Sequence, residues 1–180
     1  MSTFANPAGG AQDSAAAYTA ALLDLLGARD PLSVLEETPA ALRGAVVGLS
    51  GAAVRRPEAE GKWSVLQVLE HLVDSETVYG YRLRAILTED EPELAGYDQD
   101  RWAERLRYDA GDLEEALETF AVLRRRTLRL FRTLGADEWE RVGRHSERGR
   151  ESVRHIAKLL AAHDLVHLRQ IERIKQALRG

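Results

Sequence analysis

Two histidines four positions apart, His163 and His167, are the residues of this sequence whose spacing most clearly suggests chemistry. In a helix, at about 100° per residue, this spacing places both imidazoles on one face. The same face carries apolar side chains, namely Ile156, Leu160, Ile171 and Ile174. Burying two polar rings is costly unless their nitrogens find partners. A divalent metal ion satisfies both rings at once, because neutral imidazole is a common zinc ligand.

A third histidine decides between a metal site and a hydrogen-bonded polar core, because an H-x-x-x-H pair also arises by chance. His71 lies in the middle of another predicted helix, at the edge of its apolar face. A helix bundle can point His71 at His163 and His167, which gives three protein ligands and leaves one position for water or substrate. We therefore expect one divalent ion on these three residues, in a reactive site rather than a closed structural one.

The same segment allows a second interpretation. His163-Asp164-Leu165-Val166-His167 approximates the H-E-x-x-H motif of zinc metallopeptidases, in which the glutamate is the general base. Here an aspartate with a shorter side chain stands in that position. Downstream of the motif Glu172 is the only acidic residue, and no further histidine follows. The sequence therefore lacks an obvious third ligand of the metallopeptidase kind.

Composition and charge limit the possible partners. The chain has 180 residues, a net charge of −4 and no cysteine, which excludes disulfides, thiolate metal sites and a cysteine nucleophile. Any thiol chemistry would need a thiol from outside the chain. The charge offers no basic face for a nucleic acid or an anionic membrane. Arginines alternate with acidic residues, so we expect Arg82, Arg84 and Arg124 to Arg126 mostly on solvated faces. One of them could bind an anionic thiol cofactor, but the sequence does not say which.

The N-terminus lacks a basic segment followed by an apolar one, and no run of 18 apolar residues occurs. We therefore expect a cytoplasmic protein with a small-molecule substrate and no membrane or nucleic-acid partner.

Helical periodicity predicts the elements that position these histidines. Apolar residues recur at helical spacing, and no segment alternates as a strand does. The expected helices cover residues 14–49, interrupted near Gly27, and residues 64–88, 112–134 and 151–178. Ser64 and Gln67 predict a capping box, and residues 97–108 predict a loop with one short helix. The sequence thus predicts an all-α four-helix bundle over residues 14–180, after a flexible leader at 1–13.

Four motifs, in this order, resemble those of the DinB superfamily. Trp63-Ser64 leading to His71-Leu72-Val73-Asp74-Ser75-Glu76 resembles its W-S-x-x-x-x-x-x-H-L-x-D-x-E stretch. Residues 97–103 are similar to the segment that follows the second helix. Residues 145–149 resemble the H-P-E-x-G loop of the bacillithiol-transferase branch, with Ser146 in place of proline. Residues 162–171 match the last-helix motif H-D-x-x-H-x-x-Q-I.

This resemblance implies a bundle with helices running up, down, down and up, one long crossover, and a nickel, zinc or similar ion on the three histidines. It also implies a homodimer and an S-transferase that uses bacillithiol, mycothiol or a similar thiol in stress response or detoxification. Under this hypothesis Asp98, Asp100, Trp102 and His145 contact the substrate or the metal ligands at the mouth of the site. The alternatives are a metal-dependent hydrolase on the same site and a non-catalytic, stress-induced metal-binding scaffold.

Overall fold

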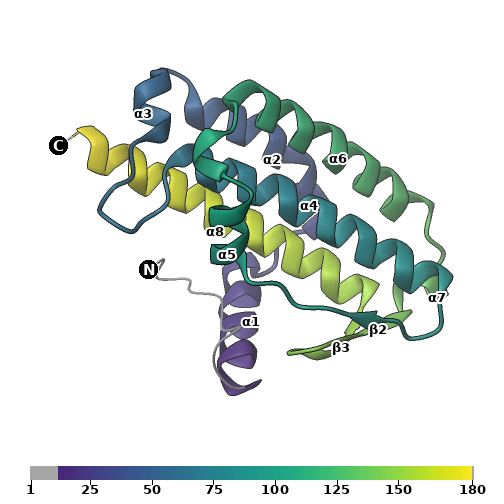
Figure 1. The fold of residues 1–180 in the computed structure, drawn as a ribbon. Coiled ribbons are helices and arrows are strands. Elements are labelled where there is room, and N and C mark those ends of the chain that lie inside the picture. Colours follow the sequence, from purple (N-terminus) through teal and green to yellow (C-terminus); the bar gives the residue numbers. More distant parts are fainter. Residues whose placement is uncertain (1–11, 180) are drawn as a thin grey trace.

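Four long helices pack along their lengths in the computed structural model (Figure 1), which describes residues 12–179. They are α2 (Pro31–Val46), α4 (Val65–Thr88), α6 (Leu113–Thr133) and α8 (Val153–Arg179). Side-chain caps begin three of them: Asp30 starts α2, the predicted capping box of Ser64 and Gln67 starts α4, and Asp112 starts α6. The expected leader lies outside the described residues except for its last two positions.

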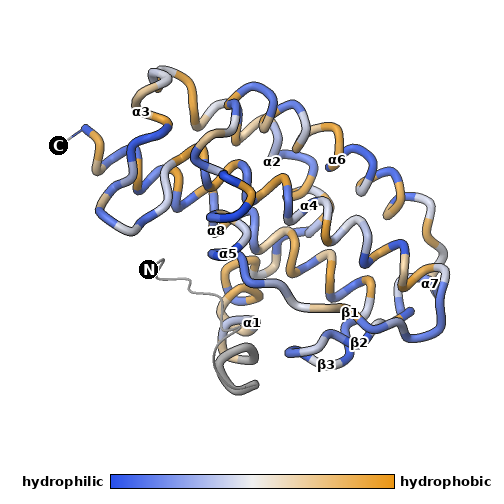
Figure 2. The backbone as a smooth tube through the Cα atoms, in the orientation of Figure 1, coloured by the Kyte–Doolittle hydropathy of each residue, from blue (hydrophilic) through white to orange (hydrophobic). Residues whose placement is uncertain are grey.

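Two apolar clusters fill the core and fix the direction of each helix. The first joins the starts of α2 and α8 to the ends of α4 and α6, through Val34, Leu35, Leu83, Ile86, Leu128, Phe131, Val153 and Ile156. The second joins the opposite ends, through Leu42, Val46, Val65, Leu69, Leu117, Phe120, Ile171 and Ile174. Figure 2 shows hydrophobic and hydrophilic residues alternating along the long helices. The helices therefore run up, down, down and up, as expected.

The first expected helix is in fact two separate helices. α1 (Gln12–Leu26) ends before Gly27, whose positive φ of +59° turns the chain. Figure 1 shows α1 crossing the bundle rather than continuing α2. Leu22 and Leu26 of α1 pack into the first apolar cluster, so α1 covers one side of the bundle near α8.

Three short strands correct the expectation that the chain has none. They are β1 (Glu93–Leu94), β2 (Val142–His145) and β3 (Gly149–Ser152), in the sheet order β1-β2-β3. β2 and β3 form an antiparallel hairpin that pairs His145 with Gly149, and β1 pairs with β2 in parallel. Strands of two to four residues are too short to produce a recognisable alternation of apolar and polar residues. The hairpin places His145 beside the connection that follows α4.

The long crossover links α4 to α6 and runs back along the bundle, because these two helices are parallel. It contains β1, the short helix α5 (Gln99–Arg105), which confirms the prediction for residues 97–108, and a 3₁₀ turn (Tyr108–Ala110). Two further short helices, α3 (Gly51–Arg55) and α7 (Ala136–Trp139), were not expected. None of the described helices is both long enough and apolar enough to span a lipid bilayer.

A buried cluster of charged groups joins all four long helices. Arg124 of α6 is fully buried and donates to Glu76 Oε1 of α4 at 2.8 Å and to Asp164 Oδ2 of α8 at 2.6 Å. It also donates to the backbone oxygen of Leu35 in α2, at 3.0 Å. Thr127 donates to the second oxygen of Glu76 at 3.0 Å. Burial raises the pKa of Glu76, although Arg124 opposes this effect.

This cluster corrects part of the expectation for the arginines. Arg84, Arg125 and Arg126 are exposed, as expected, whereas Arg82 and Arg124 are buried. Arg124 follows Phe120 by four positions and therefore lies on the inward face of α6.

We predict that Arg124→Met lowers the free energy of unfolding by about 3–5 kcal/mol, because two buried carboxyl groups lose their partner. Urea denaturation measures this loss. The control Arg43→Met breaks the exposed pair with Glu114, which should cost less than about 1 kcal/mol. Equal losses in the two variants would show that the buried cluster contributes no more to stability than an exposed ion pair.

We also predict that Gly143→Ala destabilises the hairpin that carries His145. A Cβ at this position would lie 2.8 Å from Leu94 Cδ1 and 2.9 Å from Ile86 Cγ1, both on buried side chains. Overpacking of this kind costs about 1–3 kcal/mol in the free energy of unfolding, again measurable in urea. Gly44→Ala is the control, since no atom lies within 4 Å of its Cβ and the helix should become slightly more stable.

Candidate metal centre

The structure brings together the three histidines that the sequence singles out. His71 comes from α4, and His163 and His167 come from α8. The Nε2 atom of His163 lies 3.1 Å from Nε2 of His71 and 3.1 Å from Nε2 of His167. One possible ligand atom from each residue lies within 4.8 Å of the others. Two nitrogens bound tetrahedrally at about 2.0–2.1 Å from one ion are about 3.3 Å apart, so this spacing suits a single metal ion.

Burial keeps these imidazoles neutral. It lowers the pKa of His163 to about 4, with further contributions from Arg124 and Arg148. It lowers the pKa of His167 to about 3, an effect that His163 increases. Burial and the two other rings also hold the pKa of His71 well below its ordinary value. Near neutral pH all three residues therefore keep a lone pair, which is the form that binds a metal ion.

Hydrogen bonds between the rings do not satisfy the cluster on their own. Nδ1 of His167 donates to Gln170 Oε1 at 2.8 Å, so Nε2 of His167 carries a lone pair. Nε2 of His163 contacts Nε2 of both His71 and His167, but it carries at most one proton and can donate to only one of them. The buried Nδ1 atoms of His71 and His163 have no hydrogen-bond partner among the described residues. A single cation accepts a lone pair from each Nε2, so the donor set fits a divalent metal ion.

A small pocket reaches two of the three histidines. Its volume is about 70 Å³, and His71 and His163 form part of its wall. The other lining residues come from α1, α4, the crossover and the hairpin, and include Tyr18, Ser75, Tyr79, Arg82, Tyr97, Gln99, His145, Glu147 and Arg148. This pocket gives access to the site from one side, and polar side chains among the described residues surround that access.

The predicted residues at the mouth have different positions. His145 lines the small pocket, and Trp102 packs against Tyr97 with ring centroids 4.5 Å apart. Asp98 is exposed and caps α5, where it accepts from the backbone N–H groups of residues 100 and 101. Asp100 lines a larger cavity instead. Neither aspartate lines the small pocket, whereas Gln99 between them does.

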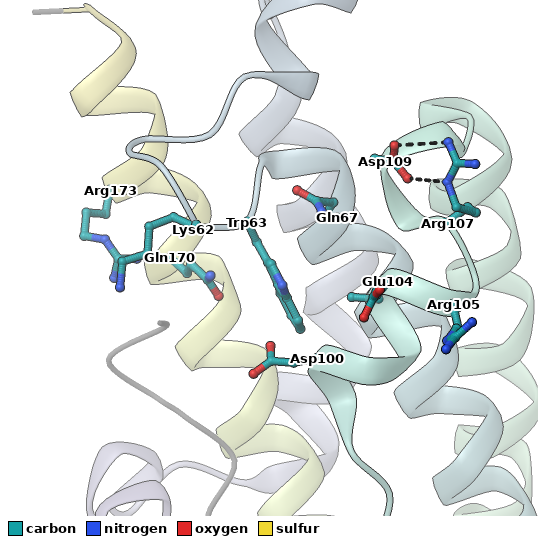
Figure 3. Close-up of a pocket in the computed structure, with 12 residues that line it drawn as sticks. Lys62, Trp63, Gln67, Asp100, Glu104, Arg105, Arg107, Asp109, Gln170 and Arg173 are labelled. Carbon is teal, nitrogen blue, oxygen red and sulfur yellow. Dashed lines mark hydrogen bonds and ion pairs between the residues drawn. The ribbon is translucent and has the colours of Figure 1, made fainter.

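The larger cavity has a volume of about 980 Å³, and Trp63 and Gln170 form part of its wall. Figure 3 shows Trp63 and Gln170 on its wall, with Asp100 facing it from α5. Trp63 packs against His71 with ring centroids 5.1 Å apart, and Gln170 bonds to His167. These two side chains therefore stand between the larger cavity and the histidines.

Asp164 does not have the role that the metallopeptidase interpretation requires. Both of its carboxylate oxygens accept hydrogen bonds from Arg124, at 2.6 and 3.1 Å. Its side chain is buried in the cluster of charged groups around Arg124. A carboxylate that is held in this way is not free to act as a general base toward a metal ligand.

Several residues around the site received no role from the sequence alone. Gln170 follows His167 by three positions, so helical spacing could have identified it as the partner of that ring. No comparable spacing singles out Arg82 or Arg148 on the pocket wall. The two residues come from α4 and from the hairpin of β2 and β3, and a sequence does not show how these elements are placed relative to each other.

Comparisons with known proteins agree with this fold. The sequence model described as the DinB superfamily matches residues 34–171. A protein of Oceanobacillus iheyensis, provisionally named a metal-dependent hydrolase, is 31% identical over 140 residues, which are 78% of this chain and 81% of the relative. YfiT of Bacillus subtilis, provisionally named in the same way, is 34% identical over 110 residues, which are 61% of this chain and 62% of YfiT.

A solved structure of YfiT, described as an unusual four-helix bundle, matches with a TM-score of 0.77 at 28% identity. The match covers 82% of this chain and 85% of that chain.

We predict that Gln170→Leu weakens metal binding by about 10–100-fold, because His167 loses the acceptor that orients its ring. Competition with a fluorescent zinc chelator measures the affinity. Arg169→Ala, an exposed position on the same helix, should leave the affinity unchanged. An unaltered affinity in Gln170→Leu would mean that His167 needs no orienting partner.

Proposed function

Because this chain belongs to the DinB superfamily, we propose that it is a metal-dependent S-transferase. Its co-substrate is a low-molecular-weight thiol, such as bacillithiol or mycothiol, and its role is in stress response or detoxification. The observation that carries this proposal is the meeting of three neutral imidazoles at the wall of a pocket. A structural metal needs a closed site, whereas a pocket that reaches two ligands supports a reactive one.

His71, His163 and His167 would hold one divalent ion, nickel or zinc. When bound, such an ion acts as a Lewis acid that lowers the pKa of a thiol or a water molecule. The protein's own contribution is to fix the ligands and to limit solvent. Gln170 orients His167, and the buried walls of the pocket exclude bulk water from one side of the cluster.

The polar groups of the pocket favour a thiol over water as the nucleophile. Attack by water is assisted by a general base, but the only carboxylate among the described residues of the pocket wall is that of the half-buried Glu147. Nδ1 of His145 already accepts a hydrogen bond from the backbone N–H of Glu147. A thiol would need less help from a base, because its ordinary pKa of about 8.5 lies far below that of water. The absence of cysteine fits a thiol that comes from outside the chain.

In the proposed reaction the thiol sulfur forms a bond to an electrophilic carbon of the second substrate. The bond from that carbon to its leaving group breaks, and the leaving group takes the electron pair. The thiol proton passes to solvent. Hydrolysis on the same histidines is the second candidate, which the provisional names of the relatives favour.

We predict that the zinc- or nickel-loaded protein accelerates the reaction of bacillithiol or mycothiol with monochlorobimane above the spontaneous rate. His167→Ala should lower this rate at least about 100-fold, because metal activation is worth several kcal/mol. Arg169→Ala again serves as the control. A parallel assay follows the hydrolysis of p-nitrophenyl acetate. Metal-dependent hydrolysis without thiol conjugation would reject the transferase in favour of the hydrolase.

A further inference from the structure

Arg82 carries a charge inside the protein without an ion-pair partner. Its side chain on α4 is 3% exposed, and its guanidinium donates to the backbone oxygen of Ala95 and lies 5.4 Å from the ring centre of Tyr79. No described carboxylate forms an ion pair with it. Burial accordingly lowers its pKa. A buried charge is costly in free energy unless it is paired, so an anion bound next to Arg82 would be stabilising.

The neighbouring charges do not supply this anion. Arg148 is the other cation on the pocket wall among the described residues, and it donates to both oxygens of Glu151, at 2.5 and 3.1 Å. Glu147 reaches the pocket from the hairpin turn, where its carboxylate lies against Gly96 and interacts with Arg148. Arg82, Arg148, Glu147 and Glu151 together carry no net charge, so the preference for an anion rests on Arg82, which forms no ion pair with a described carboxylate.

His145 offers a hydrogen-bond donor to the same space. Its Nδ1 atom accepts from the backbone N–H of Glu147 at 3.1 Å, which leaves the ring proton on Nε2. The side chain is 4% exposed, and Nε2 has no partner among the described residues. Burial and the charges of Arg148 and Arg82 lower its pKa to about 4, so the ring is neutral and Nε2 donates.

Arg82 and His145 therefore present a buried cation without an ion-pair partner and a buried donor without a hydrogen-bond partner among the described residues, in the pocket whose wall includes His71 and His163. The cavity volume of about 70 Å³ is room for about two water molecules, which suits a group of carboxylate size. We propose that this pocket binds a carboxylate group of the substrate, held by Arg82 and His145 next to the metal centre. This assignment rests on the proposed function, because it takes the pocket as the substrate site.

Two thiols that differ only in one group test the proposal. The probes are 3-mercaptopropionate and its alcohol counterpart 3-mercapto-1-propanol, titrated into the cobalt-substituted protein and followed by the sulfur-to-cobalt charge-transfer band. The wild type should bind the carboxylate thiol about 10-fold or more tightly, because a charge-assisted hydrogen bond supplies that difference. Arg82→Met should abolish the preference, and Arg82→Lys should retain part of it. Arg84→Met, exposed on the same helix, should leave the preference intact.

A second arm does not need the metal. Propionate and inorganic phosphate are titrated calorimetrically into metal-free wild type and Arg82→Met. Propionate binding that is lost in Arg82→Met supports the carboxylate site. Failure of both thiols to bind cobalt would contradict the proposed function but not the carboxylate site. Equal binding of both thiols by the wild type overturns the carboxylate site and leaves the thiol chemistry standing. Binding of phosphate in preference to propionate overturns the carboxylate assignment.

Arg82→Met also has a structural control. If Arg82 only fastens the crossover to α4 through Ala95, the variant loses thermal stability while the preference between the two thiols stays as in the wild type. That combination overturns the proposal. Loss of the preference at unchanged stability supports it.

Discussion

The buried guanidinium of Arg124 is the interaction on which the arrangement of the helices depends. It bonds to Glu76 of α4, Asp164 of α8 and the backbone of Leu35 in α2. Sliding α4, α6 or α8 would therefore leave a buried charge unpaired, and sliding α2 would break a buried hydrogen bond. Two of these partners are close in sequence to the three histidines of the candidate site. Asp164 follows His163 directly, and Glu76 lies just over one helical turn after His71. The cluster therefore sets the separation of α4 and α8 at which the three imidazoles meet.

The low polarity of the same core gives the imidazoles their chemical character. Burial lowers their pKa values, so the rings stay neutral and their lone pairs converge on one point. On one side Gln170 and Trp63 close the cluster, and on the other the small pocket opens toward Arg82 and His145. One arrangement thus provides three neutral imidazoles and a polar access in which buried Arg82 has no ion-pair partner among the described residues. Both features suit a small substrate that carries a nucleophile and an anionic group.

Much of this architecture follows from local rules that a single sequence displays. The four long helices follow from apolar periodicity and caps such as Ser64 with Gln67, and the pairing of His163 with His167 follows from spacing on one helix. The separate direction of α1 depends on the backbone conformation at Gly27, which the sequence suggested only as a break. The burial of Arg82 and Arg124 was missed, because exposure depends on which helices face each other.

The proposed function depends on the binding of one divalent metal ion by His71, His163 and His167. Metal content by plasma mass spectrometry, on the untagged wild type and on a His163→Ala, His167→Ala double variant, tests it most directly. We expect about one equivalent of nickel, zinc or a similar ion in the wild type and none in the variant, because one remaining imidazole cannot hold the ion. No metal in the wild type after incubation with excess ions, or equal content in both proteins, would contradict it.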